Sequence, residues 1–189
     1  DDRLGGNGVA NSTVFGGIAG DTLGDWTPKH GQFRDPDEDA IEEALESCRH
    51  PLGQSGGNVE DVREELHELM WEDVGILRDG ESLSRGKSGL DALEQQLDKT
   101  GVDGSNLAFN MTWHDWLNLK NMITVSKSIT ETAIAREDSR GAHFRVDFPE
   151  TIGLETSAFT SVRLKGGGFV VETKPVDFNR VKPGETLIV

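Results

Sequence analysis

Apolar side chains recur every three or four residues in three long segments of this 189-residue chain. The first segment follows Asn58, a good helix cap, and its apolar positions are Val59, Val62, Leu66, Leu69, Met70 and Val74. The second follows Gly80, with Leu83, Leu90, Leu93 and Leu97, and the third runs from about Thr112 to Asp138, with Met122, Val125, Ile129 and Ala133. This spacing places each set on one face of an α-helix. Three apolar faces predict a three-helix bundle.

The pattern changes beyond Gly153, where short runs rich in β-branched and aromatic residues replace the helical spacing. Phe159 to Leu164 and Phe169 to Thr173 flank Gly166-Gly167-Gly168. Two such runs around a glycine turn predict a β-hairpin. Thr186 to Val189 is a candidate for one further strand.

The first quarter of the chain is less regular. From Asn7 to about Leu23 the residues are small and mostly uncharged, as in a helix buried against another domain. Gly24 to Asp35 carries a proline, a glycine and single charges, which favours a linker. Asp35-Pro36 then supplies a cap and a first-turn proline for an acidic helix to about Cys48.

These patterns together predict a mainly α fold. We expect a three-helix up-and-down bundle, similar to a spectrin repeat, with a small C-terminal β-hairpin and a separate N-terminal helix within residues 1–25. Residues 26–57 are predicted to form a linker and short helix, residues 58–150 the helical bundle domain, and residues 151–189 the hairpin segment.

Composition and charge exclude several classes of function. The chain has 34 Asp and Glu against 19 Lys and Arg, and its formal net charge of −15 repels nucleic acid phosphates. No apolar run approaches the roughly 18 residues that span a bilayer. The five histidines are dispersed and Cys48 is the only cysteine, so the sequence predicts neither a zinc site nor an iron–sulfur cluster.

The opening segment carries the clearest candidate chemistry. Arg3 precedes Gly5 and Gly6, which allow close backbone approach, and Asn7 is a good cap for a helix that starts there. The free N–H groups of Gly8 and Val9 would then point outward at the positive end of the helix dipole, beside an anion. A guanidinium suits a carboxylate because it donates two parallel hydrogen bonds. The alternative is an exposed terminal arginine without a ligand.

Three stretches resemble the flavoprotein subunits of succinate dehydrogenase and fumarate reductase, a family that includes L-aspartate oxidase. Asp2-Arg3-Leu4-Gly5-Gly6-Asn7-Gly8-Val9, followed by Val14-Phe15-Gly16, is similar to the family's Asn-Arg-Leu-Gly-Gly-Asn-Ser-Leu segment and its Val-Phe-Gly. Met70 to Arg78 and Glu137 to Glu150 resemble two later family stretches. The resemblance covers nearly the whole chain and corresponds to the C-terminal third of such a protein. The chain is therefore expected to be a fragment that lacks its N-terminal FAD-binding domain.

The resemblance implies a role for the opening residues. Residues 1–25 would be the remnant of the FAD-binding domain, Arg3 would bind a carboxylate of the dicarboxylate substrate, and Asn7, Gly8 and Val9 would meet the flavin. Glycine at position 8 replaces the family's serine, so a hydroxyl contact is lost while backbone donation remains. Hydride would pass from substrate to flavin N5 while an arginine shuttles the proton, and that arginine lies upstream. No catalytic residue is expected in this fragment, and FAD is not expected to bind it in isolation.

The resemblance also implies partners and a location. The parent oxidoreductase would interconvert succinate and fumarate in electron transport, with an iron–sulfur subunit as a candidate partner and no nucleic acid. It would be cytoplasmic, or peripheral on the cytoplasmic side of the inner membrane through partner subunits. Two alternatives stay open. One is an L-aspartate oxidase-like flavoenzyme, and the other is a non-enzymatic interaction module that docks through Trp113 and Trp116.

A polar cluster downstream has two interpretations. Arg140, His143, Arg145 and Asp147 could bind a ligand, or they could form an ion-paired structural corner. We favour the corner, with Arg140 facing a helix C-terminus and Gly141 ending that helix. Tryptophans such as Trp113 and Trp116 are most often core or interface anchors.

Overall fold

The computed structural model of the chain describes residues 7–104, 106–153, 155–179 and 181–185. By its internal contacts the chain divides after Glu46 into two compact units. We describe each unit separately.

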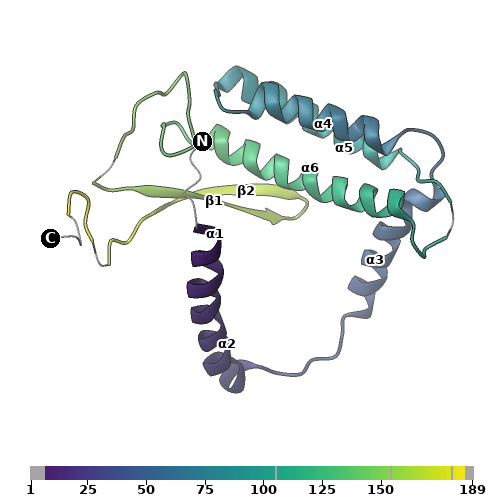
Figure 1. The fold of residues 1–189 in the computed structure, drawn as a ribbon, viewed down its shortest axis with the longest axis horizontal. Helices are drawn as coiled ribbons and strands as arrows, with labels where there is room; N and C mark the ends of the chain where they lie inside the picture. Colours follow the sequence, from purple (N-terminus) through teal and green to yellow (C-terminus); the bar gives the residue numbers. More distant parts are fainter. Residues whose placement is uncertain (1–6, 105, 154, 180, 186–189) are drawn as a thin grey trace. The chain divides into compact units, whose positions relative to one another are not determined.

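The first unit is built on the predicted N-terminal helix, which the structure describes from Asn7 onward. Helix α1 (Asn7–Ala10), a π-helical turn η1 (Asn11–Phe15) and helix α2 (Gly16–His30) follow one another, and the residues at both junctions keep helical dihedral angles. Figure 1 shows this helix in purple. The predicted linker begins later than Gly24, because the helix continues to His30 with Pro28 inside it, and residues 31–37 have no regular secondary structure. Pro28 lies in the last turn, where its missing N–H removes one backbone hydrogen bond just before the helix ends.

Helix α3 (Glu38–Arg49) crosses the division between the units and is followed by a short 3₁₀ helix, η2 (His50–Gly53). The predicted cap at Asp35 is wrong. The Asp37 carboxylate accepts a hydrogen bond from the Ala40 N–H at 3.1 Å, and the Asp37 carbonyl accepts from the Ile41 N–H. Asp37 therefore caps this helix, two residues later than predicted.

The second unit contains the predicted three-helix bundle, formed by α4 (Val59–Val74), α5 (Gly80–Asp98) and α6 (Met111–Ala135). Each of the three helices packs on the other two. The Asn58 side chain accepts from the Glu60 N–H, and Asp79 forms a reciprocal capping box with Ser82. Figure 1 shows the three helices side by side.

Two glycines bring α4 and α5 close together. A β-carbon on Gly86 would lie 2.7 Å from Val74 Cγ2, and one on Gly89 would lie 2.0 Å from Leu69 Cδ1. Because real β-carbons do not approach other atoms so closely, a larger residue at Gly86 would clash with the stiff Val74 side chain, and one at Gly89 would force the flexible Leu69 side chain to move. Glycine is needed here for packing, at some cost in helix propensity.

The core confirms two predicted faces and corrects the third. The buried apolar residues of the bundle are Val59, Val62, Leu66, Val74, Leu83, Leu90, Leu93, Leu97, Trp116, Leu119, Ile123 and Ala133. On α6 the predicted face of Met122, Val125 and Ile129 is wrong, since these side chains are 37%, 56% and 40% exposed. Ala133 is the one predicted residue of that helix that is buried. The buried face instead includes the hydroxyl residues Ser126 and Thr130.

The predicted hairpin is confirmed. Strands β1 (Ala158–Lys165) and β2 (Gly168–Pro175) pair antiparallel, with Lys165 opposite Gly168. Gly166 and Gly167 have φ values of 60° and 79°, which suits the two-residue turn that matches strand twist. Both strands pack on α6. The predicted strand at Thr186 to Val189 lies outside the described residues.

Candidate functional site

The opening segment is the first candidate site, and the structure describes part of it. Arg3 lies outside the described residues, as do Leu4, Gly5 and Gly6. The described part of the helix starts at Asn7, so the predicted cap role of Asn7 depends on residues outside the described range. Val9 is 74% exposed, and a β-carbon built on Gly8 would meet no atom within 4 Å. The space beside Gly8 is therefore open, while any helical carbonyl partners of the Gly8 and Val9 N–H groups would lie outside the described residues.

The π-helical turn is a feature that the sequence analysis missed. It covers Asn11–Phe15, immediately after the candidate residues, and π-helical turns are frequent at functional sites. The Ser12 hydroxyl donates to the Gly8 carbonyl at 2.8 Å. The run of residues 11–14 has low helix propensity, which was the available signal for an irregular turn.

Apolar side chains of this first helix are exposed. They include Val9, Val14, Phe15, Ile18, Leu23 and Trp26, all more than half exposed. Neither η1 nor α2 contains a buried residue. Such a helix does not bury enough surface to be stable by itself, as expected for one that packs on a further domain.

The second candidate site lies where the bundle helices end. We call the group of Arg78, Asp138, Arg140, His143, Arg145 and Asp147 the polar corner. Its central pair is Arg145 and Asp147, joined by two hydrogen bonds of 2.7 Å each. Arg145 is 3% exposed and also donates to the carbonyls of Ala133, Ile134 and Arg136 at the end of α6. The ion-paired corner predicted from the sequence is confirmed.

The predicted roles within the corner need one correction. Helix α6 ends at Ala135, so Arg140 and Gly141 do not end it. Arg145 takes the role predicted for Arg140, because it returns to the helix end and satisfies the last carbonyl groups. Arg140 instead donates to Ser157 Oγ and to the Ile152 carbonyl, and it lies 3.5 Å from Asp138.

The same corner also holds the neighbouring ends of α4 and α5. The Asp147 carboxylate accepts from the Gly80 N–H at the start of α5, at 2.9 Å. Arg78 Nε donates to the carbonyls of Val74 and Gly75 at the end of α4. The Arg145 guanidinium holds the pKa of Asp147 well below its usual range, so this carboxylate stays charged at neutral pH. The Arg145–Asp147 pair thus connects the end of α6 to the start of α5, and Arg78 holds the end of α4.

His143 is held in a defined protonation state. Arg78 Nη1 lies 2.9 Å from His143 Nδ1, and because arginine only donates, Nδ1 accepts and carries no proton. Nε2 then donates to the Arg136 carbonyl at 3.3 Å. Burial lowers the pKa of His143, and the charges of Arg78, Arg136 and Arg145 lower the pKa further, against the opposing hydrogen bond to Arg136. His143 is therefore neutral at pH 7.

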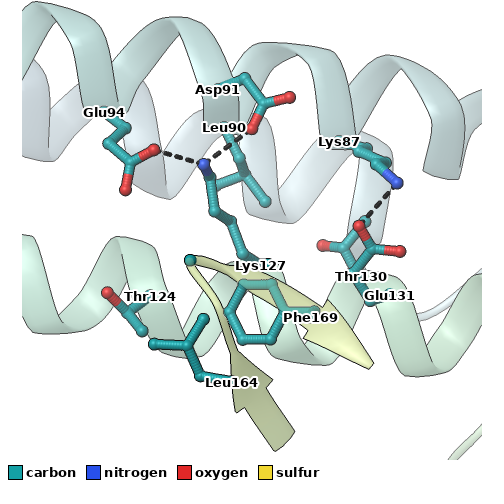
Figure 2. Close-up of a pocket in the computed structure, with 12 residues that line it drawn as sticks. Lys87, Leu90, Asp91, Glu94, Thr124, Lys127, Thr130, Glu131, Leu164 and Phe169 are labelled. Carbon is teal, nitrogen blue, oxygen red and sulfur yellow. Dashed lines mark hydrogen bonds and ion pairs between the residues drawn. The ribbon is translucent and has the colours of Figure 1, made fainter. Parts of the chain in front are cut away.

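A third cluster lies between α5, α6 and the hairpin turn, around a cavity of about 310 Å³. Lys127 contacts Asp91 at 2.7 Å and Glu94 at 2.5 Å, and Lys87 contacts Glu131 at 2.6 Å. Figure 2 shows these pairs with Phe169 and Leu164 of the hairpin beside them. Burial would lower the pKa of Lys127, but the hydrogen bonds and charges of Asp91 and Glu94 outweigh it and raise that pKa. Since both lysines are paired within the cluster, it acts as a brace between the two helices.

Trp113 and Trp116 are anchors within the second unit, as expected. Trp116 is 2% exposed, and its Nε1 donates to the carbonyls of Leu97 and Thr100. Trp113 is half-buried, and its Nε1 donates to the Cys48 carbonyl at 2.7 Å. Across the ranges that the structure describes, no three His, Cys, Asp or Glu side chains are grouped to hold a metal ion. Within the same ranges, no helix has the length and apolar character to cross a membrane.

Comparison with known proteins points to one family. The family described as "Fumarate reductase flavoprotein C-term" matches residues 63–187. The chain is 35% identical over 149 residues to an uncharacterised FAD-dependent oxidoreductase of Methanocaldococcus jannaschii, a match that covers 79% of this chain and 26% of that protein. It is 32% identical over 193 residues to a fumarate reductase flavoprotein subunit of Mycobacterium tuberculosis, covering 97% of this chain and 33% of the relative.

A solved structure agrees with these relatives. A quinol fumarate reductase chain of E. coli superimposes with a TM-score of 0.85 and 25% identity, covering 97% of this chain and 32% of that chain. The chain thus spans between a quarter and a third of the length of the proteins that it matches.

Proposed function

This chain belongs to the family of fumarate reductase flavoprotein C-terminal domains, and on that premise we propose that its full-length protein is an FAD-dependent oxidoreductase that interconverts succinate and fumarate. The observation that carries the proposal is the family match over residues 63–187, with the Arg3-Leu4-Gly5-Gly6-Asn7 segment ahead of it. The chain contributes to the active site at its opening residues and contains no catalytic residue.

The opening residues fit one edge of a flavin. A helix start at Asn7 would offer the N–H groups of Gly8 and Val9, and the open space beside Gly8 supports this assignment. When bound, FAD supplies the centre that exchanges hydride with the substrate. The two N–H groups would stabilise negative charge on the reduced ring, since a helix N-terminus favours anions. The rest of an FAD site requires residues outside this chain.

Arg3 is assigned to the substrate. Its guanidinium would donate two parallel hydrogen bonds to one carboxylate of the dicarboxylate and so orient the carbon that loses or gains hydride. Lysine would be a poor replacement because its ammonium group is a point charge without this fork.

The bundle has a structural role and contacts neither the flavin nor the substrate in this proposal. We propose that the bundle and its polar corner pack against the flavin-binding domain and stabilise it. We also propose that the surface of the bundle binds an iron–sulfur subunit. The match to a quinol fumarate reductase chain supports partner subunits in general. A peripheral place on the cytoplasmic side of the inner membrane is part of the proposal that comes from the family resemblance.

The reaction is tested with the full-length protein. We expect the purified protein to carry FAD, to reduce fumarate with a reduced viologen dye, and to oxidise L-aspartate far more slowly. Preferred oxidation of L-aspartate would assign the chain to an L-aspartate oxidase-like enzyme. A full-length protein without flavin would instead support a non-enzymatic interaction module.

A further inference from the structure

Helix α6 presents an apolar stripe that the bundle does not cover. Met122, Val125 and Ile129 follow one another at three and four residue steps, so they share one face of the helix. Their side chains are 37%, 56% and 40% exposed. A stripe of this kind on a helix normally faces a partner.

The stripe leads into a groove at the end of α6. The groove has a volume of about 330 Å³ and is lined by Ile129 and Ala133 of α6 and Phe159 of β1, together with Arg78, Arg136 and His143. Phe159 is 47% exposed and extends the apolar surface onto the hairpin. The groove therefore combines an apolar floor with a cationic side, in a chain of formal net charge −15.

Arg78 differs from the other arginines around this groove. Arg136 pairs with Asp138 at 2.7 Å and Arg145 pairs with Asp147 at 2.7 Å. The hydrogen bonds of Arg78 go to two carbonyl groups and to neutral His143, and among the described residues no carboxylate lies within ion-pair distance of it. Burial lowers the pKa of Arg78, as expected for a partly desolvated cation without an anion. Such a guanidinium is suited to accept a carboxylate from a bound partner.

We propose that this stripe and groove are the docking surface for an apolar segment bearing a carboxylate that pairs with Arg78. The segment belongs to the part of the same polypeptide outside this chain, so this inference rests on the proposed full-length flavoprotein. The relatives are three to four times as long as the matched region, which leaves ample chain to supply the segment. A second copy is disfavoured because two chains of charge −15 repel one another.

Thiol labelling of the full-length protein tests whether the stripe is covered. Val125→Cys places a thiol on the stripe, and Thr124→Cys places one on the neighbouring exposed position of another face of α6. We expect maleimide to label Val125→Cys roughly tenfold or more slowly than Thr124→Cys, because a covered site reacts only when it opens. Equal labelling rates in a protein that binds FAD and reduces fumarate would overturn the docking surface and leave the proposed function intact.

Cross-linking tests the carboxylate. In full-length protein with Arg78→Lys, a carbodiimide should form an amide bond between the new amine and the partner carboxylate, and mass spectrometry should place that acid outside residues 1–189. Arg78→Gln should give no such product and should raise the labelling rate of Val125→Cys at least severalfold. Cross-links between two copies, or only to acids within this chain, would overturn the proposal.

Discussion

Arg145 is the residue that most of the polar corner depends on. It is almost fully buried, forms a bidentate pair with Asp147, and satisfies three carbonyl groups at the end of α6. Its removal would leave Asp147 without its partner and those carbonyls without a donor. The carbonyl groups carry most of the penalty, because Asp147 is exposed and keeps the hydrogen bond from the Gly80 N–H.

We therefore expect Arg145→Ala to lower the free energy of unfolding of the chain by about 2–4 kcal/mol, mainly through the carbonyl groups that lose their donor. Arg163→Ala is the matched control, since Arg163 is exposed and pairs with Glu172 on the hairpin surface at 2.8 Å. That control should cost about 1 kcal/mol or less. Urea denaturation followed by circular dichroism measures both variants. Equal losses would show that the corner contributes no more than a surface pair.

The lowered pKa of His143 predicts how the free energy of unfolding depends on pH. Its pKa is lowered in the folded chain, so between that value and the ordinary value of about 6.5 the unfolded chain binds more protons. The neutral imidazole thus contributes stability that is fully present above pH 6.5 and is lost as pH falls. Asp147 stays ionised throughout this range and adds no slope.

We expect the urea midpoint of the chain to fall between about pH 7.5 and about pH 5.5, and to fall less in His143→Gln. Glutamine cannot titrate, while its amide can still accept from Arg78. The same pH dependence in both proteins would show that folding does not lower the pKa of His143.

At the scale of elements, α4 and α5 could be predicted because their capping residues and the spacing of their apolar residues indicate the same helices. Asn58 caps the first helix, and their leucines and valines keep helical spacing and are buried. On α6 the apolar residues misled the prediction. Thr130 is fully buried because its hydroxyl donates to the Ser126 carbonyl one turn earlier, and a satisfied hydroxyl can occupy a core position. A pattern of apolar residues alone cannot detect such a face.

Contacts between residues that are far apart in the sequence could not be predicted either. The sequence placed a basic residue near the end of the third bundle helix, but it could not show that the chain turns and that Arg145, rather than Arg140, reaches the carbonyl groups. For the same reason the contact between Arg78 and His143, which are 65 residues apart, followed from no local pattern.

The first helix gives a prediction at this scale. Its apolar side chains are exposed, so in the 189-residue chain the amides of residues 7–30 should exchange with deuterium at rates near those of an unfolded peptide. Amides of α5, which faces both other bundle helices, should be strongly protected. Hydrogen exchange with mass spectrometry compares the two helices directly. Similar protection in a monomeric chain would contradict the view that the first helix needs a further domain.

For the whole molecule, the bundle and hairpin make up the part that the sequence and structure describe most fully, while the chemistry depends on the opening segment. Asn7, Gly8 and Val9 lie at the start of the described part of the first helix, and Arg3 lies outside the described residues. The resemblance of this segment to a known motif assigned roles to these residues, which composition and spacing could not do. Arg3 is therefore the residue on which the functional account depends.

The most direct test is the steady-state rate of fumarate reduction by the full-length protein with Arg3→Ala, alongside Arg3→Lys and the exposed control Arg34→Ala. Loss of a charge-assisted pair to the substrate should cost about 2–5 kcal/mol, which lowers kcat/KM roughly thirtyfold to several thousandfold. FAD content should stay unchanged in every variant, and Arg34→Ala should remain within a small factor of the parent. An Arg3→Ala enzyme with normal flavin content and near-normal efficiency would contradict the assignment of Arg3 to the substrate.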